Sequence, residues 1–119
     1  MTPFGLKMRE WRAQKGFTLA DQALFLDVSP AYISALEHGK RGGVAPAIVD
    51  QICVWLGLIW DDAEELKQLA LLSHPKPTID TRTLSAEATE AANLLSQNID
   101  RLSDDDCAEL TGWLRAHLS

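Results

Sequence analysis

Cysteine and histidine are scarce in this 119-residue chain, and neither is grouped. The two cysteines, Cys53 and Cys107, form no C-x-x-C motif, and the histidines stand singly at His38, His74 and His117. Metal sites and redox centres need clustered ligands or paired thiols. We therefore expect reduced structural thiols, no metal, no cofactor and no catalytic base, and a protein that is not an enzyme.

Long hydrophobic runs are also missing. The longest apolar stretch, ICVWLGLIW at 52–60, has less than half the length that a membrane-spanning helix needs. The N-terminus, Met1-Thr2-Pro3-Phe4, lacks the charged start and long apolar segment of a secretory signal. We expect a cytoplasmic protein without a membrane partner.

Positive charge is in the minority, and it is concentrated at one end of the chain. The formal net charge is −6, which alone would argue against a nucleic-acid partner. Through Arg41, however, six basic side chains stand against four acidic ones, whereas five stand against thirteen beyond it. A polyanion is therefore attracted by the first third of the chain and repelled by the rest.

Strand signals are almost absent, because the chain has no Asn-Gly or Asp-Gly hairpin turn and no clean alternation of β-branched residues. Signals for helix starts and stops are frequent instead. Thr2-Pro3, Thr18 with Asp21, Ser29-Pro30, Pro46 and Asp61 with Glu64 mark the expected starts. They predict helices at about 3–15, 19–26, 30 to 37 or 38, 46–56 and 62–72.

The apolar spacing within these helices predicts one compact all-α domain over residues 1–72. Ile33 and Leu36 are expected to be core positions of the third helix. The tryptophans are assigned to the core rather than to a base-stacking platform. They are Trp11, Trp55, Trp60 and Trp113.

The C-terminal part is predicted to be separate. Residues 73–83 contain two prolines and few apolar side chains, which is typical of a linker. Residues 84–119 carry two apolar stripes, the second in a helix that begins at Ser103. These stripes are too narrow for an independently stable pair of helices. Either this acidic segment mediates dimerisation, or it binds a partner protein.

The connection between the second and third helices has only three residues, as in a helix-turn-helix. The segment TLADQALFLDVSPAYISALEHGKR (18–41), preceded by FGLKMREWRAQKGF (4–17), resembles the Cro/C1 (Xre-type) helix-turn-helix family of phage and bacterial regulators. The resemblance covers about residues 3–72. It implies a five-helix, lambda-repressor-like DNA-binding domain whose third helix enters the major groove.

The resemblance also implies a set of site residues. The base-facing positions are Pro30, Ala31, Ser34 and Ala35. Phosphate contacts are expected from Thr18, Ser29, Tyr32, Lys40 and Arg41, with the start of the second helix as an anion seat. Family members form a salt bridge between the residues that match Arg12 and Glu37.

Three positions depart from the family pattern. Asp27 stands where glycine is common at the turn, Leu19 replaces a phosphate-binding Gln, and Gln22 replaces an apolar core residue. The base-facing turn also has no Arg, Asn or Gln for bidentate pairing with a base. His38 or Gln22 is therefore expected to add to the readout, and specificity per half-site is expected to be modest.

The sequence thus favours a sequence-specific regulator that binds double-stranded DNA, as a homodimer on a palindromic operator. An alternative is an antitoxin-type autoregulator whose acidic C-terminal segment binds a partner protein. A third possibility is a scaffold that uses the same fold for protein contact alone. The basic N-terminal third favours the first two.

Overall fold

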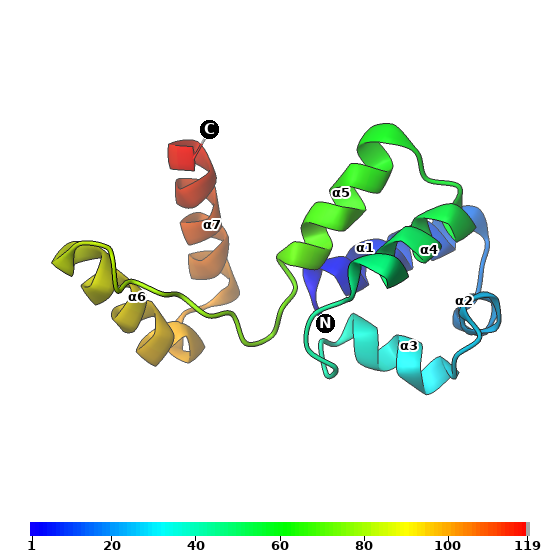
Figure 1. The fold of residues 1–119 in the computed structure, drawn as a ribbon, viewed down its shortest axis with the longest axis horizontal. Coiled ribbons are helices and arrows are strands. Elements are labelled where there is room, and N and C mark those ends of the chain that lie inside the picture. The colour runs from blue at the N-terminus through cyan, green and yellow to red at the C-terminus, as the bar shows by residue number, and fades with distance from the viewer. Residues whose placement is uncertain (119) are drawn as a thin grey trace. The chain divides into compact units, whose positions relative to one another are not determined.

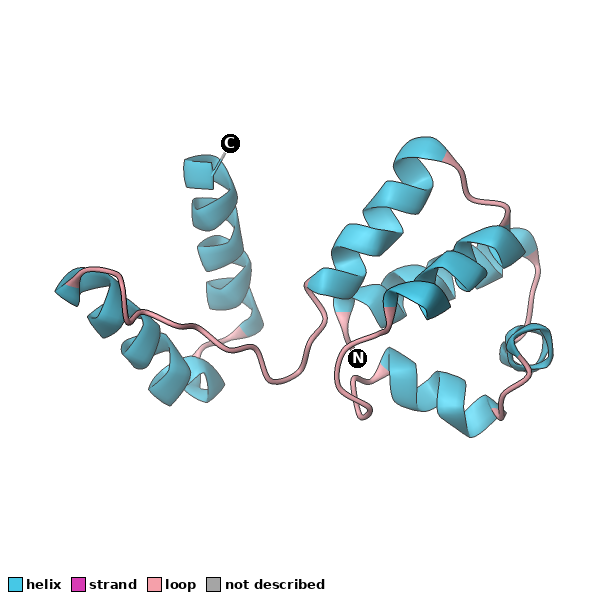
Figure 2. Ribbon diagram, viewed as in Figure 1, coloured by secondary structure: helices cyan, strands magenta, loops and turns pink. Residues whose placement is uncertain are grey.

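The structure is a computed structural model, and it describes residues 1–118. Within this range it consists of helices and contains no strand (Figure 2), so the predicted all-α class is confirmed. The elements are α1 (Pro3–Lys15), α2 (Leu19–Leu26), α3 (Pro30–Glu37), α4 (Pro46–Leu56), α5 (Trp60–Leu71), α6 (Ala86–Asn98), the 3-10 turn η1 (Ile99–Arg101) and α7 (Asp104–Leu118).

The chain divides into two compact units between Pro77 and Thr78. Unit 1 contains α1 to α5, and unit 2 contains α6, η1 and α7 (Figure 1). None of the helices described is long and apolar enough to cross a membrane.

Local capping explains where the first helices begin and end. The Thr2 hydroxyl accepts a hydrogen bond from the Gly5 amide at 3.1 Å, and α1 stops at Gly16, which adopts a left-handed conformation with φ 75°. Thr18 and Asp21 form a reciprocal capping box at the start of α2. The predicted bounds of α1 and α2 are confirmed because these signals lie within one turn of each helix end.

The predicted start of α5 was wrong. This helix begins at Trp60 rather than at 62, and Ile59 precedes it without a side-chain cap. Asp61 is therefore inside the first turn, where its charge interacts favourably with the positive end of the helix dipole. Trp60 itself has φ 53°, a left-handed conformation that is rare for a bulky side chain. No sequence signal indicates such a start.

All five helices of unit 1 contribute to one hydrophobic core. Ile33 and Leu36 are 0% and 4% exposed, as expected for the inner side of α3. The other core residues are Phe4, Met8, Ala23, Val49, Ile52, Cys53, Leu56, Leu58, Leu66 and Ala70. This core fixes the position of α3 from behind.

The assignment of all four tryptophans to the core was wrong. Trp60 is 84% exposed and Trp113 is 58% exposed. Trp11 and Trp55 are half-buried and pack against the core. The Trp55 ring stacks on Phe17, with 4.7 Å between the ring centroids. Of the tryptophans described, Trp11 and Trp55 therefore cover the margin of the core, whereas the aromatic ring buried within it is that of Phe4.

The first five residues of the expected linker, 73–77, belong to unit 1. Ser73 is buried, and its hydroxyl accepts a hydrogen bond from the Phe4 amide at 2.9 Å. It also donates to the Leu69 carbonyl. The amides of a first helical turn have no partner within the helix. Ser73 satisfies one of them, and this ties the end of α5 to the start of α1.

Unit 2 has well-capped helices but no buried side chain among its described residues. Ser85 caps α6 by accepting from the Ala88 amide at 3.1 Å. Ser103 and Asp106 form a capping box at the start of α7, where the sequence predicted a helix start. Local capping interactions thus define the two helices, whereas their apolar faces are not buried by tertiary packing.

Candidate nucleic-acid interface

The turn between α2 and α3 consists of residues 27–29 and needs a left-handed residue. Asp27 supplies it with φ 56° and ψ 48°. Its neighbour Val28 closes the end of α2 by donating to the Ala23 carbonyl at 3.0 Å. Asp adopts this conformation more readily than most residues. The Asp that replaces the usual glycine therefore preserves the helix-turn-helix geometry.

The front of α3 is formed by small side chains. Ser29 caps the helix by accepting from the Tyr32 amide at 3.1 Å, and Pro30 occupies the first helical position. Helical spacing places the four expected base-facing residues on the side opposite Leu36. Pro30 and Ala31 are exposed, and Ser34 and Ala35 are half-exposed. This face is accessible and has little side-chain bulk.

The loop after α3 carries the exposed basic groups. His38 is exposed, and its Nδ1 lies 2.9 Å from the Ser34 carbonyl oxygen. Lys40 and Arg41 are also exposed, after a left-handed Gly39 with φ 72°. The Arg41 guanidinium lies 4.7 Å from the centre of the Tyr32 ring, a cation–π contact. This contact joins two of the expected phosphate-binding residues.

The expected anion seat at the start of α2 already holds a carboxylate. Thr18 is exposed, and its hydroxyl accepts from the Asp21 amide at 3.1 Å. In return, Asp21 Oδ2 accepts from the Thr18 amide at 2.8 Å. The Asp21 charge repels a phosphate at this position. Thr18 thus remains accessible, but the α2 terminus is less favourable for phosphate than the sequence suggested.

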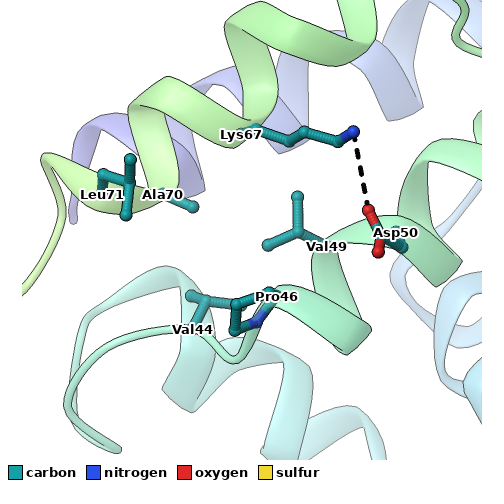
Figure 3. A pocket seen from close by; sticks show the side chains of 7 residues that line it. All are labelled: Val44, Pro46, Val49, Asp50, Lys67, Ala70 and Leu71. Atoms are coloured by element: carbon teal, nitrogen blue, oxygen red, sulfur yellow. Dashed lines mark ion pairs between the residues drawn. The ribbon is translucent and has the colours of Figure 1, made fainter.

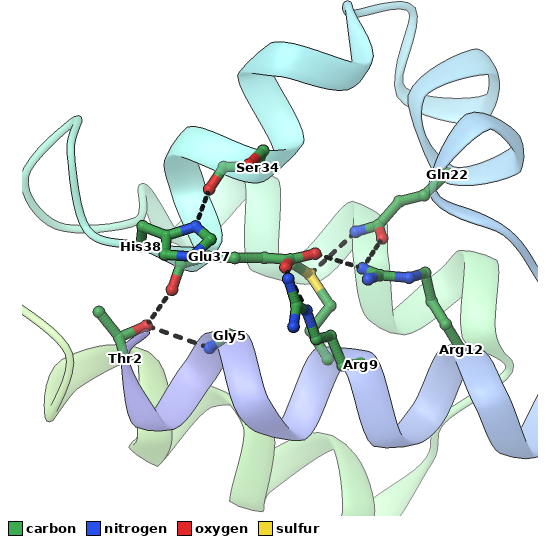
Figure 4. Close-up of polar contacts among 9 residues, drawn as sticks. Thr2, Gly5, Arg9, Arg12, Gln22, Ser34, Glu37 and His38 are labelled. Carbon is green, nitrogen blue, oxygen red and sulfur yellow. Dashed lines mark hydrogen bonds and ion pairs between the residues drawn. The ribbon is translucent and has the colours of Figure 1, made fainter.

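A buried carboxylate connects α3 to α1 (Figure 4). Glu37 is 1% exposed, and its Oε1 lies 2.6 Å from Nη1 of Arg12. Its Oε2 accepts a hydrogen bond from Nε of Arg9 at 2.8 Å. The structure therefore brings together the expected pair and adds Arg9, for which no contact with Glu37 was predicted. Two guanidinium groups neutralise one buried negative charge.

Gln22 completes this network, so its expected role in base readout was wrong. Its side chain is 0% exposed and cannot reach a base. Its Oε1 accepts from Arg12 at 2.8 Å, and its amide donates to Met8 Sδ at 2.9 Å (Figure 4). A polar residue occupies this otherwise apolar position because Arg12 is buried there and needs a second acceptor.

The network changes how the basic residues of α1 are interpreted. Arg9 and Arg12 are engaged by Glu37, and Lys7 pairs with Glu65 at 2.9 Å. The hydrogen bond from Lys7 to Glu65 raises the pKa of the Lys7 ammonium above its usual value. Much of the positive charge in the first third of the chain is therefore paired with carboxylates of unit 1. Lys40 and Arg41 become the main candidates for phosphate contacts.

A glycine in the first turn of α1, Gly5, allows the end of α3 to lie close to the start of α1. A Cβ atom on Gly5 would overlap the Glu37 carbonyl oxygen and Cα. The same carbonyl accepts from the Thr2 amide at 2.9 Å and from the Thr2 hydroxyl at 3.1 Å (Figure 4). Only glycine permits this approach, which sets the angle of α3 relative to α1.

A separate apolar cavity of about 340 Å³ lies between α4, α5 and the loop before α4 (Figure 3). Its lining residues are Val44, Pro46, Val49, Asp50, Lys67, Ala70 and Leu71. The polar groups at this cavity, Lys67 and Asp50, pair with each other at 3.7 Å. Ligand sites combine apolar walls with several convergent polar groups. This cavity lacks such a set, and we assign no ligand to it.

Comparison with known proteins agrees with this geometry. The sequence model of the family described as "Helix-turn-helix domain" matches residues 3–68. An uncharacterized HTH-type transcriptional regulator of Bacillus subtilis (strain 168), RghRB, is 34% identical over 62 residues. The match covers 52% of this chain and 45% of that protein, so the chain aligns with less than half of its relative. No solved structure matches the chain. The chain belongs to the helix-turn-helix domain family.

Proposed function

We propose that unit 1 binds double-stranded DNA as part of a transcriptional regulator of the Cro/C1 (Xre) type. The observation that carries this proposal is the arrangement of α3. Its front is exposed and built from small side chains, Lys40 and Arg41 follow it, and its back is fixed by the core and by Glu37. A rigid helix with a slim face and cations beside it suits the major groove.

The small side chains on the exposed face of α3 determine which base edges this helix can recognise. Ala31, Ala35 and Pro30 can contact thymine methyl groups, and Ser34 can donate to or accept from more than one base. Bidentate pairing from this face is not available, since none of its side chains is Arg, Asn or Gln. Specificity per half-site is therefore modest, and DNA shape contributes the remainder.

The operator is proposed to be palindromic and to bind two copies of the chain. In two-fold helix-turn-helix complexes the half-sites lie about one helical turn apart, roughly 34 Å. Two copies also double the number of phosphate contacts. The relative RghRB supports a role in transcription through its description as an HTH-type regulator.

The salt dependence of DNA affinity tests the proposal. A complex that contacts about 6–10 phosphates loses roughly 10³–10⁵ in affinity between 50 and 200 mM salt. Replacing a phosphate-binding lysine reduces the slope of log affinity against log salt by about 1 per contact. Because two copies bind the operator, we expect the slope to fall by about 2 for Lys40→Gln, measured by fluorescence anisotropy on a selected duplex.

Lys67→Gln is the matched control, because Lys67 is an exposed lysine of unit 1 on α5 that pairs with Asp50. Its slope should equal that of the unchanged protein. A flat salt response in the unchanged protein, or equal slopes for the two variants, would contradict the proposed role of the loop.

A further inference from the structure

Unit 2 contains an open apolar cleft between its two helices. α6 and α7 extend from η1 like the arms of a V (Figure 1), and the cleft they enclose has a volume of about 650 Å³. It is lined by Ile79, Ala91, Ala92, Leu94, Leu95, Asn98, Leu102, Leu110, Trp113 and Leu114. None of these side chains is charged, and only Asn98 is polar.

The lining of this cleft is unusually exposed for a hydrophobic surface. Leu94 and Trp113 are each 58% exposed, and Leu114 is 42% exposed. Contiguous apolar surface of this kind on a soluble protein marks an interaction site. Two open helices with an apolar interior suit a third helix, which would lay its apolar side into the cleft.

The charges beside the cleft specify the partner. On α6, Glu87 and Glu90 each precede a lining residue by four positions, Ala91 and Leu94 respectively. Residues four apart on a helix are neighbours on the same side. These two carboxylates therefore border the α6 wall of the cleft.

The α7 wall repeats this pattern. Asp106 and Glu109 precede Leu110 and Trp113, respectively, by four positions. The arginine of α7, Arg115, does not share this spacing with any lining residue. Both walls are thus bordered by acidic side chains.

The acidic border argues against a second copy of the chain as the occupant. Two copies joined through this cleft would bring eight of these carboxylates together, and like charges across an interface are unfavourable. Of the other two arginines of unit 2, Arg82 already pairs with Asp80 at 2.7 Å, and Arg101, next to the lining residue Leu102, adds one positive charge against the four carboxylates. A helix with an apolar stripe and basic flanks complements both the apolar lining and the acidic border of the cleft.

We propose that the α6–α7 cleft binds an amphipathic helix with basic flanks from a partner protein. The helix places its apolar stripe against Leu94, Leu110 and Trp113, and its lysines or arginines against the acidic border. This interaction goes beyond the proposed DNA binding and does not depend on it.

The test uses the full chain without DNA, so its outcome is independent of the proposed function. The probe is a fluorescein-labelled 18-residue helical peptide with leucine at i, i+3, i+4 and i+7 spacing and lysine elsewhere. A second peptide has glutamate in place of lysine. We expect one lysine peptide per chain, with an affinity at least tenfold higher than that of the glutamate peptide, measured by fluorescence anisotropy.

Two kinds of variant locate the binding site. Leu110→Asp should weaken binding of the lysine peptide at least tenfold, whereas Leu118→Asp, on the same helix but outside the cleft, should change it less than twofold. Glu90→Gln with Glu109→Gln keeps the apolar lining and should weaken binding about three- to tenfold. Asp61→Asn with Asp62→Asn removes two charges from unit 1 and should leave binding unchanged.

Several results would overturn the proposal. One is equal affinity for the lysine and glutamate peptides, and another is equal loss in the two charge-removal variants. A third is a dimer in sedimentation equilibrium that Leu110→Asp dissociates, because this would identify a second copy as the occupant. Circular dichroism of the Glu90→Gln, Glu109→Gln variant shows whether its helices are intact.

Discussion

At the scale of single residues, Glu37 is the side chain on which the geometry of α3 depends most. It is buried at the end of α3 and is neutralised by two arginines of α1. Removing one partner of a buried ion pair leaves a charge without compensation, which is far more costly than losing an exposed pair. The two arginines differ in burial, so they make a matched pair of variants.

Arg12→Leu should lower the free energy of unfolding by roughly 3 kcal/mol, because it leaves both Glu37 and Gln22 without their buried partner. Arg9→Leu should cost less than about 1 kcal/mol, because the Arg9 side chain is 54% exposed and its interaction is screened by water. Urea denaturation measures both. Similar losses for the two variants would contradict the assigned role of Arg12.

The two cysteines should also differ in reactivity. Burial raises the pKa of the Cys53 thiol, so less of its reactive thiolate is present at a given pH. Cys107 is half-exposed. Iodoacetamide at pH 8 is therefore expected to modify Cys107 first, and Cys53 at least tenfold more slowly until the chain is unfolded. Mass spectrometry of tryptic peptides measures both rates, and equal rates in the folded protein would contradict the buried position of Cys53.

At the scale of helices, the serines of α3 have separable roles. Ser29→Ala removes the cap at the Tyr32 amide and should lower stability by about 1 kcal/mol. Ser34→Ala should leave stability nearly unchanged, because Ser34 is half-exposed and lies within the helix. It should instead weaken DNA binding. Thermal unfolding and anisotropy, measured on both variants, test this division; a larger loss of stability for Ser34→Ala would contradict it.

The helix bounds that could be predicted from the sequence are those set by local contacts. Thr2, Gly16 and the Thr18–Asp21 box act within one turn, and their residue types are sufficient to locate α1 and α2. The start of α5 could not be predicted, because Trp60 is held in a left-handed conformation that its residue type does not favour. The burial of Ser73, just after α5, could not be predicted either, because it depends on a partner 69 positions away.

The same distinction applies to the candidate interface. The exposed face of α3 follows from helical spacing and could be predicted. The burial of Gln22 could not, because it depends on Arg12, ten positions away on another helix. Gly5 likewise shows its importance only through its contact with Glu37. The exposed surface of the candidate interface therefore follows from helical spacing, while the contacts that fix its shape are tertiary.

At the scale of the whole molecule, charge is divided between two kinds of surface. Unit 1 presents Lys40 and Arg41 beside α3, whereas residues 78–119 carry eight acidic and three basic side chains. The first surface suits a polyanion, and the second suits a basic partner. The proposed DNA and protein partners would thereby bind to separate units and would not compete for the same charges.

The central claim is that the small-residue face of α3 lies in the major groove, and replacement of thymine by uracil tests it most directly. This change removes only the methyl group in the major groove. On a duplex selected from random sequences, we expect at least one thymine per half-site whose replacement weakens binding about fourfold, equivalent to about 0.8 kcal/mol for one buried methyl. Ala31→Gly or Ala35→Gly should abolish that difference. Affinity that is unchanged by every thymine replacement would contradict the account.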